Sequence, residues 1–107
     1  MASLSIISIA DGQLAASKGT LYTVPAATQI IVKSIILVNT DSSARTVNIY
    51  VNPTGTSRRI IPKSLNLPAG ASEPFNLNVT LEAGDLIEGD ASAGTVVDYV
   101  ISGVKNA

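Results

Sequence analysis

Short runs of β-forming residues, separated by turn residues, repeat along the whole chain. No run keeps the period of about 3.6 residues that marks an amphipathic helix. Clusters rich in Gly, Pro, Asn, Asp and Ser, such as residues 39–43 and 52–55, recur at a spacing of about 8 to 12 residues. This arrangement is typical of a β-sandwich or a small barrel.

We predict a strand in each run that is rich in Val, Ile, Leu, Thr and Tyr. The pieces before and after Pro62 are short, and the proline favours an edge position for the first of them. We therefore expect about eight strands in a single-domain, all-β, antiparallel β-sandwich, either a jelly roll or a related Greek key. The runs are residues 3–9, 20–24, 28–38, 45–51, 58–61, 75–81, 86–91 and 95–104, with residues 64–67 as a further short candidate.

Some runs also predict which side chains are buried. Residues 28–38 are apolar on both alternating faces except at Lys33 and Ser34, which is typical of a strand covered on both sides. Residues 75–81 alternate strictly between apolar and polar side chains, so one face should meet the core and the other water or a partner. We expect the first run to close in a turn at Asp11-Gly12.

The chain of 107 residues has no linker, internal repeat or low-complexity segment, so we predict one domain over residues 1–107. Residues 1–18 form either its first edge strand or an N-terminal arm that adds a strand to a neighbouring sheet. The apolar start has no preceding Lys or Arg and is interrupted by serines, unlike a secretion signal. No stretch approaches the roughly 20 apolar residues of a membrane span.

Composition limits the kind of core and the kind of partner. Hydrophobic residues make up 46% of the chain but aromatic residues only 4%, so Ile, Leu, Val and Ala must form the core. The net charge of -1 argues against nucleic acid or a membrane surface as the main partner. Because the mean hydropathy of this small chain is positive, we expect an oligomer or a permanent position on a larger protein surface.

The chain has no His and no Cys, which removes the commonest general base, metal ligand and strong nucleophile. We therefore predict no enzyme activity, no metal and no cofactor. The acidic group Glu82, Asp85, Glu88 and Asp90 leaves a small Ca²⁺ module as an alternative. In the simpler interpretation Gly84 adopts a positive φ, Asp85 binds backbone amides in the turn, and Glu88 and Asp90 face water.

Two groups of residues are candidate protein contacts. One is the only local basic concentration, and the other is the apolar start of the chain. The three tyrosines, Tyr22, Tyr50 and Tyr99, are too dispersed for a base-stacking platform and are expected in the core or at an interface. The candidate contact residues are Arg58, Arg59 and Lys63 in the first group and Leu4, Ile6, Ile7 and Ile9 in the second.

Stretches at residues 21–40, 58–70 and 81–89 resemble short β-sandwich virion proteins of tailed bacteriophages. The likeness rests on Leu-Tyr-Thr-Val-Pro leading into Val-Lys-Ser-Ile-Ile-Leu-Val-Asn-Thr, on Arg-Arg-Ile-Ile-Pro leading to Leu-Pro-Ala-Gly, and on Leu-Glu-Ala-Gly-Asp-Leu-Ile-Glu-Gly. It extends in order over roughly residues 20–104.

The resemblance implies a structural role in the virion. The first candidate is a head decoration or cement protein, a homotrimer that binds and stabilises the lattice of the major capsid protein. The alternative is a neck, tail or fibre component that binds other virion proteins. A small glycan-binding module is a further candidate, although the low aromatic content weakens it.

Overall fold

The computed structural model describes residues 3–53 and 55–107, so the first two residues of the predicted 1–18 segment and Thr54 of the predicted turn lie outside it. All of its regular elements are strands. They are β1 (Leu4–Gln13), β2 (Gly19–Thr23), β3 (Gln29–Asn39), β4 (Arg45–Asn52), β5 (Arg58–Arg59), β6 (Leu65–Leu67), β7 (Ser72–Leu81), β8 (Leu86–Ala91) and β9 (Val97–Asn106).

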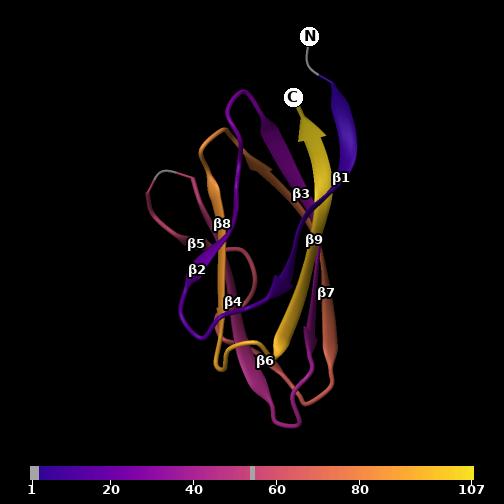
Figure 1. Cartoon of the computed structure of the whole chain (residues 1–107), viewed down its shortest axis with the longest axis vertical. Helices are drawn as coiled ribbons and strands as arrows, with labels where there is room; N and C mark the ends of the chain where they lie inside the picture. Colours follow the sequence, from indigo (N-terminus) through magenta and orange to yellow (C-terminus); the bar gives the residue numbers. More distant parts are fainter. Residues whose placement is uncertain (1–2, 54) are drawn as a thin grey trace.

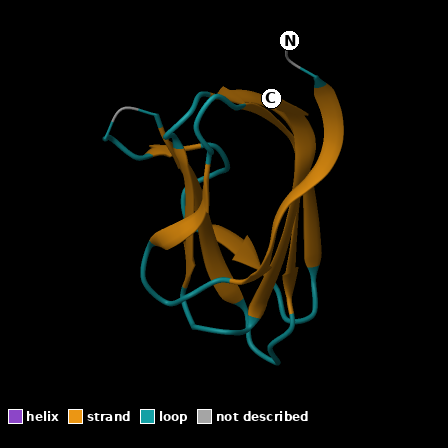
Figure 2. Ribbon diagram, turned by 45° about the horizontal axis from the view of Figure 1, so that its top comes forward, coloured by secondary structure: helices purple, strands orange, loops and turns teal. Residues whose placement is uncertain are grey.

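The strands form two antiparallel sheets that pack face to face (Figures 1 and 2). Sheet A has the order β1-β9-β3-β7, and sheet B has the order β2-β8-β4-β5, with β6 also paired to β4. The chain changes sheet at most connections, so neighbours in sequence such as β8 and β9 lie in different layers. This order is that of a jelly roll, and the predicted all-β sandwich is confirmed.

Strands β5 and β6 share one edge of sheet B. Arg58 and Arg59 pair with one end of β4, and Leu65–Leu67 pair with its other end. Pro62 lies between them and has no N–H, and Ser64 adopts a φ of 50°, so one continuous ladder cannot form. The nine strands thus occupy four positions in each sheet, which accounts for the count of about eight expected from the sequence.

Aliphatic side chains from both sheets fill the space between the layers. Tyr99 is the one aromatic member of the buried cluster among the described residues, and Phe75 packs half-buried at its margin. The predicted aliphatic core is therefore confirmed. Its central members are Ile30, Val32, Ile35, Leu37 and Ile101 from sheet A and Val47, Ile49, Val51 and Ile87 from sheet B.

Strand β1 is longer than the predicted run. It continues through Asp11 and Gly12 to Gln13, with a β-bulge between Ser8 and Ala10, and pairs with β9 along its length. A Cβ on residue 12 would lie 3.3 Å from the hydroxyl oxygen of Tyr99. The prediction of a turn at Asp11-Gly12 is wrong because this glycine makes room for an aromatic ring within a strand.

Strands β3 and β9 form the centre of sheet A. Their register runs from Gln29 opposite Asn106 to Asn39 opposite Val97, with a shift between Val32 and Ser34. Gly103 lies opposite Val32 at this shift, and a Cβ on residue 103 would lie 2.0 Å from the carbonyl oxygen of Ile31. Only glycine therefore fits at this point of the ladder.

Adjacent isoleucines on β3 test the assignment of inner and outer faces. Ile35 is fully buried, whereas Ile36 is 40% exposed on the opposite side of the sheet. We expect Ile35→Ala to lower the free energy of unfolding by about 2–5 kcal/mol and Ile36→Ala by less than about 1 kcal/mol. Urea denaturation of both variants measures the difference. Equal losses would contradict the assignment.

Gly103→Ala should destabilise the protein by about 2–3 kcal/mol or more, because the new methyl group collides with backbone rather than with a flexible side chain. Gly94→Ala is the matched control, since the nearest atom to its Cβ would be 3.7 Å away. The control should change stability by less than about 0.5 kcal/mol. Thermal unfolding compares the two, and a harmless Gly103→Ala would refute the β3–β9 register.

Candidate interaction surfaces

The outer face of sheet A is open in the described part of the chain. Side chains that alternate with the core residues of β3 and β9 point away from sheet B. Two of them are large and apolar, Ile36 at 40% exposed and Val100 at 45% exposed. The expectation that residues 28–38 are covered on both sides is therefore not met within the chain, because no second layer lies over this face (Figure 2).

The pairing registers of the four strands place the side chains of this outer face in rows that run across the sheet. Ile36 lies between Val100 and Pro74, and Ile31 lies between Val104 and Thr80. A row of small polar side chains separates the two apolar rows and contains Ser8, Ser102, Ser34 and Asn76. Lys33, at the register shift of β3, lies beside this polar row and donates a hydrogen bond to Asn78 Oδ1, so the middle of the face is polar and carries a positive charge between the two apolar rows.

The predicted contacts on β1 divide between the two faces. Ile9 belongs to the buried core, and Ile7 packs half-buried against it. Leu4 and Ile6 are 74% and 93% exposed on the outer face. In Figure 1, β1 runs beside β9 at the edge of sheet A. Leu4 and Ile6 are therefore the members of this group that a partner can reach in the folded chain.

The outer face of sheet B carries a hydrogen-bonded cluster around Tyr50. The Tyr50 hydroxyl donates to Asp90 Oδ2 at 2.9 Å, and Asn48 Nδ2 donates to Asp90 Oδ1 at 3.0 Å. Lys18 Nζ and Arg59 Cζ lie 5.2 and 5.1 Å from the centroid of the Tyr50 ring, within the range of cation–π attraction. Tyr50 is consequently buried although it points away from the core.

The basic residues predicted as contacts do not act as one patch. Arg59 packs on Tyr50 and its Nε donates to Asn48 Oδ1 at 3.4 Å, while Arg58 and Lys63 are exposed. Lys18 joins Arg59 at the ring, a contact that no sequence signal predicts because the two residues are far apart in the chain. The neighbouring carboxylates offset these charges.

The four carboxylates that suggested a calcium site have separate partners. Their contacts are Glu82 with Gln29, Asp85 with the Glu82 amide at 2.8 Å, Glu88 with Ser57, and Asp90 with Asn48 and Tyr50. In residues 3–53 and 55–107 no group of three or more His, Cys, Asp or Glu side chains is placed to hold a metal ion. Gly84 has a φ of 88°, as predicted for the turn, whereas Glu88 is buried rather than facing water.

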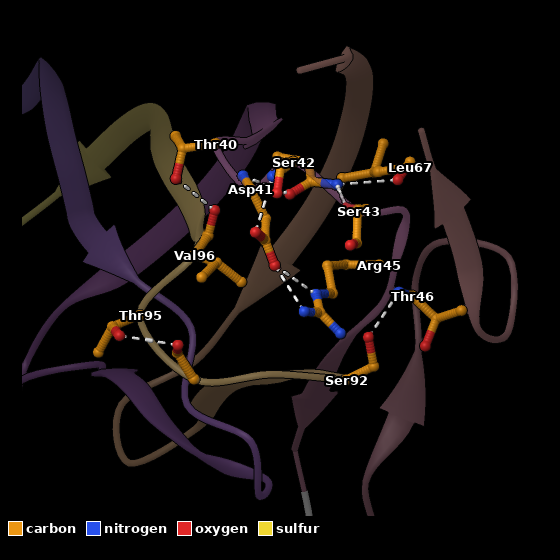
Figure 3. A network of polar contacts seen from close by, with 12 residues as sticks. Thr40, Asp41, Ser42, Ser43, Arg45, Thr46, Leu67, Ser92, Thr95 and Val96 are labelled. Carbon is orange, nitrogen blue, oxygen red and sulfur yellow. Dashed lines mark hydrogen bonds and ion pairs between the residues drawn. The ribbon is translucent and has the colours of Figure 1, made fainter. Parts of the chain in front are cut away.

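The turn between β3 and β4 holds a network of polar contacts (Figure 3). Arg45 Nη2 lies 2.6 Å from Asp41 Oδ2, and the Ser42 amide donates to Asp41 Oδ1 at 2.7 Å. The hydrogen bond from Arg45, followed by that from Ser42, lowers the pKa of the Asp41 carboxyl below its ordinary value of 3.8. This contact stabilises the fold above that ordinary value and is lost as the pH falls through the lowered pKa.

The described residues enclose no pocket and contain no helix that could cross a membrane. No protein-family model matches the chain, and no curated protein matches its sequence.

Solved structures do match its fold. A chain in the structure of infectious bursal disease virus, Gx strain, matches with a TM-score of 0.55 and 16% identity over 99% of this chain and 32% of that chain. A pentameric capsid protein from metagenomic phage sequences matches with a TM-score of 0.51 and 19% identity, over 92% of this chain and 64% of that chain.

This chain therefore shares a jelly-roll β-sandwich fold with both of these chains. It spans about one third of the virus chain and 64% of the phage chain, and at these identities the likeness concerns the fold. An exo-β-1,3-galactanase from Phanerochaete chrysosporium also matches, with a TM-score of 0.43 and 19% identity over 94% of this chain and 26% of that one.

The surroundings of Tyr50 lead to a prediction about the ionisation of its hydroxyl. Burial raises the pKa of the Tyr50 hydroxyl above its ordinary value of 10.0, and the hydrogen bond to Asp90 raises it further. The protonated hydroxyl therefore stabilises the fold below that ordinary value, and this stabilisation is lost as the pH rises through the raised pKa.

We expect Asp90→Asn to lower the pKa of Tyr50, because it removes the negative charge beside the hydroxyl. Ultraviolet difference titration of the variant and the parent protein measures this, and Tyr50→Phe identifies the Tyr50 component. A titration that Asp90→Asn leaves unchanged would show that the two side chains are not in contact.

Proposed function

We propose that this chain is a non-enzymatic structural protein of a virion, and specifically a capsid decoration or cement protein that stabilises the lattice of the major capsid protein. One observation carries the proposal: a jelly roll that matches chains of viral particles over nearly its whole length. The resemblance of its sequence to phage virion proteins supports the same role.

In this proposal the mechanism is adhesion. The outer face of sheet A, with its exposed Ile36 and Val100, is the surface that binds a neighbouring virion protein. A standard interface buries about 800 Å² on each partner, roughly one seventh of the 5522 Å² accessible surface of this chain. One sheet face is sufficient for such an area, and many copies on a particle multiply modest affinities.

Chemistry supports a binding role over catalysis. The chain has no His or Cys, and the acidic side chains that suggested calcium are engaged with separate amides and hydroxyls. The charges around Tyr50 offset one another, which supports a protein partner over nucleic acid or a membrane. A neck, tail or fibre position is the alternative within the virion.

Binding to particles that lack this protein tests the proposal. Co-sedimentation should recover the parent protein with the particles, and Ile36→Lys should reduce the bound fraction at least tenfold, because a charge is buried in an apolar contact. Lys63→Glu, an exposed change on the other side of the sandwich, is the control and should bind normally. Normal binding by Ile36→Lys would remove sheet A from the interface.

Cryo-electron microscopy of the parent particle tests the position. Density for the jelly roll on the outside of the head is the expected result. Density confined to the neck or tail would overturn the decoration role and favour the alternative, and its absence from the particle would overturn the virion role itself.

A further inference from the structure

The free edge of β1 is available for pairing with another strand. Ser3 and Ala107 exchange two backbone hydrogen bonds, at 2.8 and 3.1 Å, so the N–H and C=O groups of Ser3 point towards β9. Backbone direction alternates along a strand. The N–H and C=O groups of Leu4, Ile6 and Ser8 therefore point away from the sheet, where β1 has no neighbour in sheet A.

Over residues 4–8 this edge lacks the features that normally prevent pairing. Natural edge strands are protected by charged residues, prolines or short length, whereas residues 3–10 contain no charge and no proline. Leu4 and Ile6, at 74% and 93% exposed, are also the most exposed large apolar side chains of the described residues. The bulge between Ser8 and Ala10 limits the regular edge to residues 4–8.

We propose that a second copy of this chain pairs with β1 in antiparallel orientation, around a two-fold axis that passes through Ile6. In this register Leu4 faces Ser8 of the second copy, and the two Ile6 residues face each other. Leu4, Ile6 and Ser8 of each copy then all pair across the axis, and these pairs form about six backbone hydrogen bonds. An axis through Ser5 uses fewer of them, and an axis through Ile7 runs into the bulge.

The side chains favour the same axis. Ile6 continues the apolar row of the outer face that contains Val104 and Ile31. Across the two-fold axis the two Ile6 side chains become a directly opposed pair, which cross-strand contact stabilises. The row then runs without a charge from Ile31 of one copy to Ile31 of the other. A two-fold contact is also self-complementary, so it requires no second kind of surface.

This dimer goes beyond the proposed function and does not depend on it, because it concerns the isolated protein. It differs from the homotrimer that the resemblance implies. Sheet A of each copy keeps its outer face, including Ile36, available for a virion partner.

Sedimentation equilibrium at about 1 to 100 μM measures the assembly. The parent protein should approach twice the 11.0 kDa mass of the chain. Ile6→Lys and Ile6→Glu should each remain at 11.0 kDa, because like charges oppose each other at the axis. An equimolar mixture of the two variants should dimerise, because Lys then faces Glu.

Ile36→Lys is the matched control, since it makes the same change on the same face away from the edge, and it should dimerise like the parent protein. Circular dichroism and thermal unfolding establish that the variants are folded, as expected for a side chain that is 93% exposed. A parent protein that stays at 11.0 kDa, or forms a trimer or pentamer, overturns the proposal. A mixture that stays monomeric while the parent protein dimerises overturns the axis.

Discussion

The pairing of β3 with β9 is the constraint on which the rest of the structure depends. β1 attaches to one side of this pair and β7 to the other, so sheet A cannot form without it. The pair joins residues as distant as Gln29 and Asn106, which means that the sheet requires the last strand of the chain. Gly103 is essential at the shift in register, because any side chain there would collide with the backbone of β3.

The two faces of each sheet have different roles. Inner faces contribute aliphatic side chains to one core, and the outer face of sheet B joins Tyr50 to Asp90 and to the cations around its ring. The outer face of sheet A also has polar pairs, Lys33 with Asn78 and Gln13 with Asp98, but it leaves Ile36, Val100 and the β1 residues Leu4 and Ile6 exposed. This asymmetry in exposed apolar side chains is the reason why we propose the outer face of sheet A as the binding surface.

Much of the fold could be predicted because its signals are local. Alternation along residues 75–81 identified β7 and its buried face, and Pro62 separated β5 from β6. The side chains of residues 39–43 bind nearby backbone as expected, with Asn39 Nδ2 donating to the Ser43 carbonyl at 2.9 Å. These features depend on neighbouring residues, so one sequence is sufficient to predict them.

Features that depend on distant contacts could not be predicted. Asp11-Gly12 has the composition of a turn, and only the ring of Tyr99 explains the glycine. The apolar start of the chain does not reveal that Ile9 is buried while Ile6 is exposed, because serines and isoleucines occupy both faces. Whether the outer face of β3 is covered likewise depends on the tertiary arrangement, which the residues of one strand do not reveal.

The central claim is that sheet A carries the binding surface and that sheet B does not. Hydroxyl-radical footprinting of the free protein and of the protein bound to its particle tests this most directly, because it measures the exposure of individual side chains. The account predicts that Ile36 and Val100 lose reactivity on assembly, while Ile60 and Pro62 near the edge of sheet B keep theirs. Protection at Ile60 and Pro62 with unchanged reactivity at Ile36 and Val100 would contradict it.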